Sequence, residues 1–226
     1  MPSGPERLRI GGLTRWTSID FPGRLAAVVF LQGCPWRCSY CHNPELLDAA
    51  QDARLPWTEV RSFLAGRRGL LDGVVFSGGE PTLQAGLADA LAEVRSMGFA
   101  TALHTGGMYP QRLAALLPLL DWIGLDIKGP WDRIDGITDS RGSAARVQAS
   151  LAQVLASGVD YECRTTWHPG LFALEELQRM TGELASLGVS DWALQLARGC
   201  APVAPLPPEQ CAAFAAQFDR FTLRAA

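Results

Sequence analysis

Short apolar runs alternate along the chain with longer segments in which apolar residues recur every three or four positions. Runs rich in Val, Ile and Phe are typical of buried strands, and the longer pattern is typical of amphipathic helices. Strands are predicted over residues 25–32, 73–78, 99–105, 121–128, 159–166 and 191–197. Helices are predicted over residues 57–66, 84–97, 110–118, 143–157 and 173–187.

This alternation implies parallel strands joined by helical crossovers in a single α/β domain. Either an α/β barrel or a doubly wound sheet can be built in this way. The pattern divides the chain into an N-terminal extension over residues 1–20, a main α/β body over residues 21–200 and a final segment over residues 201–226. That final segment is rich in proline at its start and is predicted to lead into a short helix.

Composition narrows the function classes. Of 226 residues, 48% are hydrophobic and 19% are charged, which is typical of a soluble globular protein. A net charge of −3 gives no general attraction to nucleic acid or to an anionic membrane. No segment has the pattern of a signal peptide or the length of a membrane span, so we expect a cytoplasmic protein with neither nucleic-acid nor membrane partners. Thiols stay reduced there, and clustered cysteines then indicate metal or redox chemistry.

The carboxyl ends of the predicted strands carry the unusual residues. In parallel α/β folds the chemistry is located at these ends. In chain order, the motifs are a cysteine-rich loop, SGGEP, HTGG, DIKGP, CRTTWHP and ARGC. All of these motifs are therefore expected on one edge of the sheet.

The loop after the first predicted strand, LQGCPWRCSYCHNPELL, holds three of the six cysteines of the chain: Cys34, Cys38 and Cys41. Packing explains them poorly, because charged residues would share the same helical face. A disulfide leaves one cysteine unpaired, and a haem attached at CSYCH requires export and gives Cys34 no role. Zinc held by the three cysteines and His42 requires two adjacent residues to bind one tetrahedral ion.

An iron–sulfur cluster fits the loop better. Thiolates are its usual ligands, and a short loop can bind three corners of a cubane. The other cysteines, Cys163, Cys200 and Cys211, lack a motif-like spacing and are expected to be small buried residues. The fourth iron would then be open to a substrate or a cofactor, which is the arrangement of an enzyme rather than of an electron carrier.

The spacing C-x3-C-x2-C, with Tyr40 before the third cysteine, resembles the signature of radical S-adenosylmethionine enzymes. The segment SIDFPGRLAAVVFLQGCPWRCSYCHNPEL is similar to the activating enzymes of glycyl radical enzymes. Across residues 8–200, the motifs SGGEPTLQ, TALHTGGMYP, DWIGLDIKGP, DYECRTTWHPG and DWALQLARG make the chain most similar to the anaerobic ribonucleoside-triphosphate reductase activating proteins. This resemblance implies a partial (β/α)6 barrel of parallel strands over residues 21–200.

The resemblance also implies the cofactors and their ligands. Cys34, Cys38 and Cys41 match the ligands of a [4Fe–4S] cluster whose open iron chelates the amino and carboxylate groups of S-adenosylmethionine. One electron then cleaves this cofactor to methionine and a 5′-deoxyadenosyl radical. Tyr40 matches an aromatic residue near the adenine, and we include its neighbour His42 among the cofactor-binding residues. No catalytic group is expected beyond the cluster and the cofactor.

The second and third strand ends are expected to bind the methionine part of the cofactor. Gly78, Gly79 and Glu80 form a turn whose backbone carbonyls can approach the ammonium because Cβ atoms are absent, and the carboxylate adds charge complementarity. Thr105 is expected to bond the cofactor. No role is assigned to His104, or to His168 near the fifth strand.

Lys128 is the only lysine among twenty basic residues, so its position indicates a site that requires a compact ammonium. In the family that the chain resembles, the DIK motif contacts the cofactor, with Asp126 suited to the ribose hydroxyls and Lys128 to the carboxylate. Arg164 is costly to bury unpaired, and it matches an arginine that contacts cofactor or substrate peptide. Arg198 is expected to close the site.

The leading hypothesis is an activase that abstracts a hydrogen atom from a glycine of a partner enzyme. The resemblance implies anaerobic ribonucleotide reductase as that glycyl radical enzyme and a flavodoxin or ferredoxin as the electron donor. A second hypothesis is a radical S-adenosylmethionine enzyme acting on a small molecule, similar to 7-carboxy-7-deazaguanine synthase. A third is a metal-binding or electron-transfer protein, which would give the GGE and DIK motifs no function. An activase must admit a polypeptide loop from the side, whereas a small-molecule enzyme should close its pocket.

Overall fold

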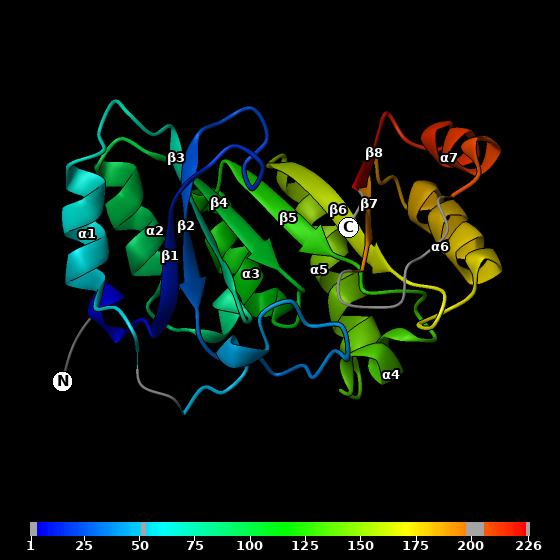
Figure 1. Cartoon of the computed structure of the whole chain (residues 1–226), viewed down its shortest axis with the longest axis horizontal. Coiled ribbons are helices and arrows are strands. Elements are labelled where there is room, and N and C mark those ends of the chain that lie inside the picture. The colour runs from blue at the N-terminus through cyan, green and yellow to red at the C-terminus, as the bar shows by residue number, and fades with distance from the viewer. Residues whose placement is uncertain (1–3, 51–52, 198–205, 225–226) are drawn as a thin grey trace.

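The computed structural model describes residues 4–50, 53–197 and 206–224. An eight-stranded sheet in the order β1 to β8 runs through the molecule (Figure 1). Strand β1 is antiparallel to β2, and all later neighbours are parallel. The strands are β1 (Ile10–Thr17), β2 (Ala26–Leu31), β3 (Gly73–Gly78), β4 (Ala100–Thr105), β5 (Trp122–Asp126), β6 (Asp160–Trp167), β7 (Asp191–Leu196) and β8 (Arg220–Arg224).

Helices connect the parallel strands. The α-helices are α1 (Trp57–Ala65), α2 (Leu87–Ser96), α3 (Pro110–Leu116), α4 (Ile134–Thr138), α5 (Ser143–Ser157), α6 (Leu174–Ser186) and α7 (Pro208–Ala215). Four short 3-10 helices are η1 (Gly4–Arg7), η2 (Pro44–Leu46), η3 (Pro81–Leu83) and η4 (Leu117–Leu119). No helix in the described ranges is both long enough and apolar enough to cross a membrane.

The predicted fold class, a single-domain α/β partial barrel of parallel strands, is confirmed. The six predicted strands correspond to β2–β7, and each predicted helix is present. Strands β1 and β8 were not predicted, although they extend the same sheet into residues 1–20 and 201–226. Their sequences, IGGLTRWT and RFTLR, contain glycine and arginine in place of a continuous apolar run, because each strand pairs along one edge only.

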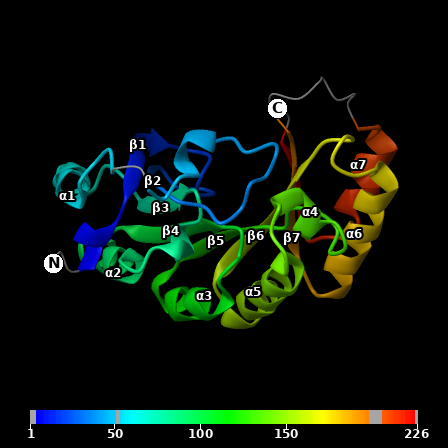
Figure 2. The same ribbon diagram turned by 90° about the horizontal axis from the view of Figure 1, so that it is seen from below.

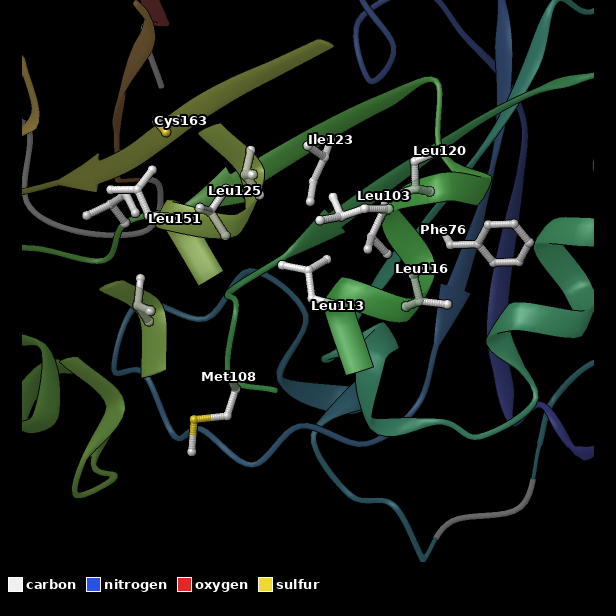
Figure 3. Close-up of a cluster of buried hydrophobic side chains, with 14 of the residues drawn as sticks. Phe76, Leu103, Met108, Leu113, Leu116, Leu120, Ile123, Leu125, Leu151 and Cys163 are labelled. Atoms are coloured by element: carbon white, nitrogen blue, oxygen red, sulfur yellow. The ribbon is translucent and has the colours of Figure 1, made fainter. Parts of the chain in front are cut away.

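The two faces of the sheet have different coverings. Figure 2 shows α2, α3, α5 and α6 in a row along one side of the strands, and the loop that follows β2 crossing the other side. The main core lies under the helices, where Phe76, Leu103, Leu113, Ile123 and Leu151 are buried (Figure 3). The opposite face therefore forms the inside of the partial barrel.

The side chains on this inner face change from apolar to polar along the strands. Successive side chains alternate between the two faces of a sheet, so every second residue points inside. A small apolar cluster that includes Val75, Ala102 and Trp122 fills the amino-terminal half of the interior. Two residues further along β3 and β4, Ser77 and His104 replace the apolar side chains. The interior therefore becomes polar toward the carboxyl ends of the strands, where the site lies.

Candidate functional site

A cavity opens at the carboxyl ends of the parallel strands, and we call it the site cavity. Every predicted site residue in the described ranges lines it, whereas Arg198 lies outside those ranges. The lining residues are Asp20, Cys34, Trp36, Cys38, Tyr40, Cys41, His42, Asn43, Leu47, Ser77, Gly78, Gly79, Glu80, His104, Thr105, Gly106, Asp126, Lys128, Arg164, Thr166 and Gln195.

Backbone hydrogen bonds hold the cysteine loop over the ends of the strands. The Gly33 amide donates to the Leu46 carbonyl over 2.8 Å, which closes the base of the loop. In its middle, the Arg37 amide donates to the Thr138 carbonyl over 2.9 Å, and the Cys41 amide donates to the Cys38 carbonyl over 3.1 Å. The loop is therefore fixed both to itself and to α4.

The three loop cysteines carry free, half-buried thiols. Burial raises the pKa of Cys34 to about 12 and also raises the pKa of Cys38. Among the described residues, no three His, Cys, Asp or Glu side chains are grouped closely enough to hold one metal ion. A tetrahedral zinc ion needs such a group, whereas the ligands of a cubane stand further apart because each binds a different iron.

The remaining cysteines lie away from this loop or outside the described residues. Cys163 is fully buried in the main core on β6, and burial raises the pKa of its thiol. Cys211 is half-buried on α7, and its thiol contacts the Leu206 carbonyl. Cys200 lies outside the described ranges. Cys163 is thus buried as its lack of motif spacing predicts, whereas Cys211 is only partly buried against the main core.

The turn after β3 contacts the cysteine loop through backbone atoms alone. A Cβ atom at Gly79 would lie 2.3 Å from the Gly33 carbonyl oxygen, and one at Gly78 would lie 2.5 Å from the backbone of Leu31. The Glu80 amide donates to the Gly33 carbonyl over 2.8 Å. Only glycines permit this approach, which places the predicted ammonium-binding turn directly beside the predicted cluster ligands.

Glu80 has a structural function that the sequence did not reveal. Its buried carboxylate accepts hydrogen bonds from the Thr105 hydroxyl over 2.6 Å, the Gly106 amide over 2.9 Å and the Thr82 amide over 3.1 Å. Burial raises the pKa of this carboxyl, and the hydrogen bonds oppose that shift. Glu80 and Thr105 therefore bind each other and join the ends of β3 and β4. Their predicted contacts with the cofactor stay predictions.

A charged group of Asp126, Lys128 and Arg164 forms the opposite wall of the site cavity. Lys128 Nζ donates to Asp126 Oδ2 over 2.9 Å, and Arg164 Nε donates to Asp126 Oδ1 over 2.8 Å. Although burial opposes ionisation, the two cations hold the pKa of Asp126 well below its usual range, and Asp126 raises the pKa of Lys128. Two cations and one anion leave this wall with a formal charge of +1.

Tyr40, in the cysteine loop, lies beside this wall. Its ring is buried, and Lys128 Nζ lies 5.9 Å from the ring centre. The Tyr40 hydroxyl is buried without a hydrogen-bond partner among the described residues. Buried polar groups are normally hydrogen-bonded, so an unpaired hydroxyl in the wall of a cavity is suited to a polar ligand.

His104 is bonded to protein groups on both sides of its ring. Its Nε2 lies 2.9 Å from the Asp20 carbonyl oxygen, to which it can only donate, and its Nδ1 lies 3.3 Å from the Ser77 hydroxyl. Burial lowers the pKa of His104 to about 3, so the ring is neutral. This histidine ties the connection between β1 and β2 to the end of β4.

The sequence analysis missed several residues of the cavity wall, among them Trp36 and Gly106. The Trp36 indole donates to the Ser143 hydroxyl over 3.0 Å. A Cβ atom at Gly106 would lie 2.1 Å from the Trp36 ring, so glycine is required where the ring packs against the chain just after β4. The tryptophan between two ligand cysteines and the double glycine of HTGG were the available signals.

The sequence profile of the Radical SAM superfamily matches residues 28–178, which include the cysteine loop and β2–β6. The chain belongs to this superfamily. Its members use a [4Fe–4S] cluster and S-adenosylmethionine, and the chain is an enzyme of this type.

Two curated relatives carry activating-enzyme names. A protein of Methanocaldococcus jannaschii, named as a glycyl-radical enzyme activating enzyme, is 28% identical over 75% of this chain and 72% of its own length. The pyruvate formate-lyase-activating enzyme of Clostridium pasteurianum is 38% identical over 53% of this chain and 52% of its own length. The chain thus spans about half the length of the second relative.

The crystal structure of QueE from Escherichia coli has the same fold. It aligns with a TM-score of 0.60 and 18% identity over 97% of this chain and 94% of its own. This likeness supports the partial barrel described above.

The residues present fit the cofactors of the superfamily. Three free thiols lie on one loop, Tyr40 with its unpaired buried hydroxyl and the net positive wall line the same cavity, and a glycine turn lies beside them. Cys34, Cys38 and Cys41 would hold the cluster. The positive wall is complementary to the carboxylate of S-adenosylmethionine.

Proposed function

We propose that this chain is the activating enzyme of a glycyl radical enzyme. Bound at the cluster, S-adenosylmethionine supplies a 5′-deoxyadenosyl radical after one-electron reduction, and that radical removes hydrogen from a glycine of the partner. The protein would bind and orient the cofactor through Lys128, Tyr40 and the Gly78–Gly79 turn.

The observation that supports this proposal is a second cavity inside the barrel, which we call the inner chamber. It shares Asp20, His42, His104, Arg164 and Gln195 with the site cavity, so the two cavities are adjacent. Its other lining residues are Ile19, Trp122, Glu162, Leu196 and Arg224. A substrate in the inner chamber would lie next to the cofactor.

The inner chamber is bounded by the two edges of the open sheet. Among the described residues, β1 pairs only with β2, and β8 pairs only with β7. Ile19, in the connection after β1, lines the chamber while 79% of its surface is exposed, and Arg224 lines it from β8. A polypeptide loop would need an entrance between these edges, because it must enter and leave as a continuous chain.

The finer assignment rests on resemblance. The motifs from residue 8 to residue 200 favour an anaerobic ribonucleotide reductase as the partner and a flavodoxin or ferredoxin as the electron donor. The names of the two curated relatives support a glycyl radical enzyme as the partner class. A cytoplasmic location belongs to the same proposal, since the thiols must stay reduced.

An anaerobic activation assay tests the proposal. The cluster-loaded, reduced protein is mixed with S-adenosylmethionine and a candidate glycyl radical enzyme, and the glycyl radical is measured by electron paramagnetic resonance. We expect one 5′-deoxyadenosine per radical, and no radical with Cys38→Ala protein. Cleavage of the cofactor without a radical on any of a panel of glycyl radical enzymes would contradict the assignment.

The second candidate is a radical S-adenosylmethionine enzyme that acts on a small molecule. In that case 5′-deoxyadenosine formation would rise on addition of a small molecule in the absence of any partner protein. The same assay therefore separates the two candidates.

A further inference from the structure

Gly124 lies in the middle of β5, on the face of the sheet that points inside the barrel. Alternation along the strand places it on the same face as Trp122, which lines the inner chamber, and Asp126, which lines the site cavity. In the register with β6, Gly124 is opposite Glu162, and Asp126 is opposite Arg164. A residue with no side chain thus stands between two positions that line the cavities.

The Arg164 side chain occupies the space above Gly124. A Cβ atom at residue 124 would lie 2.8 Å from Arg164 Cζ and 2.9 Å from the NH1 nitrogen of the same guanidinium. The NH2 nitrogen lies 3.5 Å from the Gly124 carbonyl oxygen, and Nε binds Asp126 over 2.8 Å. The guanidinium therefore lies against β5 at Gly124, and a side chain at position 124 would require it to shift.

The position of Arg164 determines the charge that Lys128 presents to the site cavity. With the guanidinium on Asp126 Oδ1, the carboxylate is shared between two cations, and the group retains one positive charge for a ligand. With Arg164 displaced, Asp126 and Lys128 would neutralise each other. The Lys128 ammonium would then be less available to a carboxylate, although the formal charge of the group would not change.

We propose that Gly124 is a positioning residue for S-adenosylmethionine. Its missing side chain gives the Arg164 guanidinium the place from which it binds Asp126, and this leaves the Lys128 ammonium available to the carboxylate of the cofactor. The inference concerns the cofactor, and so it holds whichever molecule the radical acts on.

The test is the affinity of cluster-loaded, unreduced protein for S-adenosylmethionine, measured by equilibrium dialysis without turnover. Gly124→Ala is expected to weaken binding by about tenfold to a hundredfold, the loss typical of a hydrogen bond to a charged group. Iron content should not change. Gly182→Ala is the matched control, because a Cβ atom at Gly182 in α6 meets nothing within 4 Å. Parental affinity in the Gly124→Ala protein would overturn the proposal.

A double-mutant cycle with Arg164→Ala shows whether Gly124 acts through the guanidinium. In the Arg164→Ala protein the guanidinium no longer occupies this space, so adding Gly124→Ala should reduce the affinity no further. If the loss of affinity in the double variant equals the product of the two single losses, Gly124 acts independently of Arg164 and the coupling is refuted.

If the Gly124→Ala protein fails to fold, the thermal stability of the double variant tests the proposal. The double variant should then be clearly more stable, because the clashing guanidinium is gone. The Trp122 ring is the other close neighbour, at 2.9 Å from the added atom. A double variant as unstable as Gly124→Ala would assign the clash to Trp122 and overturn the proposal.

Discussion

Replacing Lys128 by arginine is expected to impair cofactor binding nearly as much as replacing it by alanine. The Lys128 ammonium lies 2.9 Å from Asp126 Oδ2 and 5.9 Å from the centre of the Tyr40 ring, and 17% of the side chain is exposed. A wider, planar guanidinium would have to leave Asp126 or enter the space that the cofactor carboxylate needs. Arginine would keep the positive charge, but the charge would no longer lie where Lys128 presents it to the cofactor carboxylate.

The size of the effect follows from the contact that is lost. A hydrogen bond to a charged group contributes about 1.5–3 kcal/mol, which corresponds to about one to two decades in the dissociation constant. Because the side chain is mostly buried, screening by solvent and salt reduces this figure little. Lys128→Met, which keeps a similar length without the charge, separates the loss of charge from the change of shape.

The assay is the affinity of each cluster-loaded variant for S-adenosylmethionine, with iron content and thermal stability measured in parallel. Arginine, alanine and methionine at position 128 should all bind at least about tenfold more weakly than the parent, at equal iron content. If the Lys128→Arg protein binds like the parent, the single lysine is an accident of composition, and its assignment to the carboxylate is wrong.

Three further predictions concern single side chains of the same region. Alanine at any one of the three loop cysteines should abolish the absorbance of the reconstituted four-iron cluster, whereas Cys163→Ala should not; stable zinc binding without iron–sulfur absorbance would contradict this. Tyr40→Phe removes a hydroxyl that has no protein partner, so the melting temperature of the cofactor-free protein should not fall while S-adenosylmethionine binding weakens; unchanged binding would count against the ligand contact. Burial holds the pKa of His104 at about 3, below its value of about 6.5 in the unfolded chain. The contribution of the neutral ring to the free energy of unfolding should therefore be complete above pH 6.5. Below pH 6.5 the free energy of unfolding should fall by about 1.4 kcal/mol per pH unit. His104→Gln, which can still donate to Asp20, should lose less stability between pH 6.5 and 5 than the parent, and equal losses would assign the acid sensitivity to other groups.

The elements with the most uniform burial were the ones that the sequence predicted. Strands β2–β7 have neighbours on both sides and a helix layer on one face, so their apolar runs are continuous and easily recognised. Strands β1 and β8 are edge strands with mixed sequences, and only their pairing within the sheet reveals them. Sequence patterns did not predict these two strands because they lie at the edges of the sheet, and not only because they are short.

For the site as well, the sequence predicted some features and could not predict others. The predicted strand ends gave the set of residues that line the site cavity, because parallel strands bring their carboxyl ends to one edge of the sheet. Sequence could not predict how those residues share their hydrogen bonds. That Glu80 binds Thr105 and that Arg164 lies against Gly124 are consequences of register and of side-chain path, which depend on the packed fold.

The ion pair between Glu162 and Arg224 has a consequence for how this enzyme can diverge. Both guanidinium NH groups of Arg224, on β8, bind the buried Glu162 carboxylate over 2.8 Å, at the floor of the inner chamber. Neither residue touches the cysteine loop or the Gly78–Gly79 turn in the described contacts. In the activase that we propose, mutations at this pair can alter which polypeptide loop enters, while the machinery that generates the radical is inherited unchanged. Selection for a new partner and selection for radical chemistry would then act on separate residues of one small barrel.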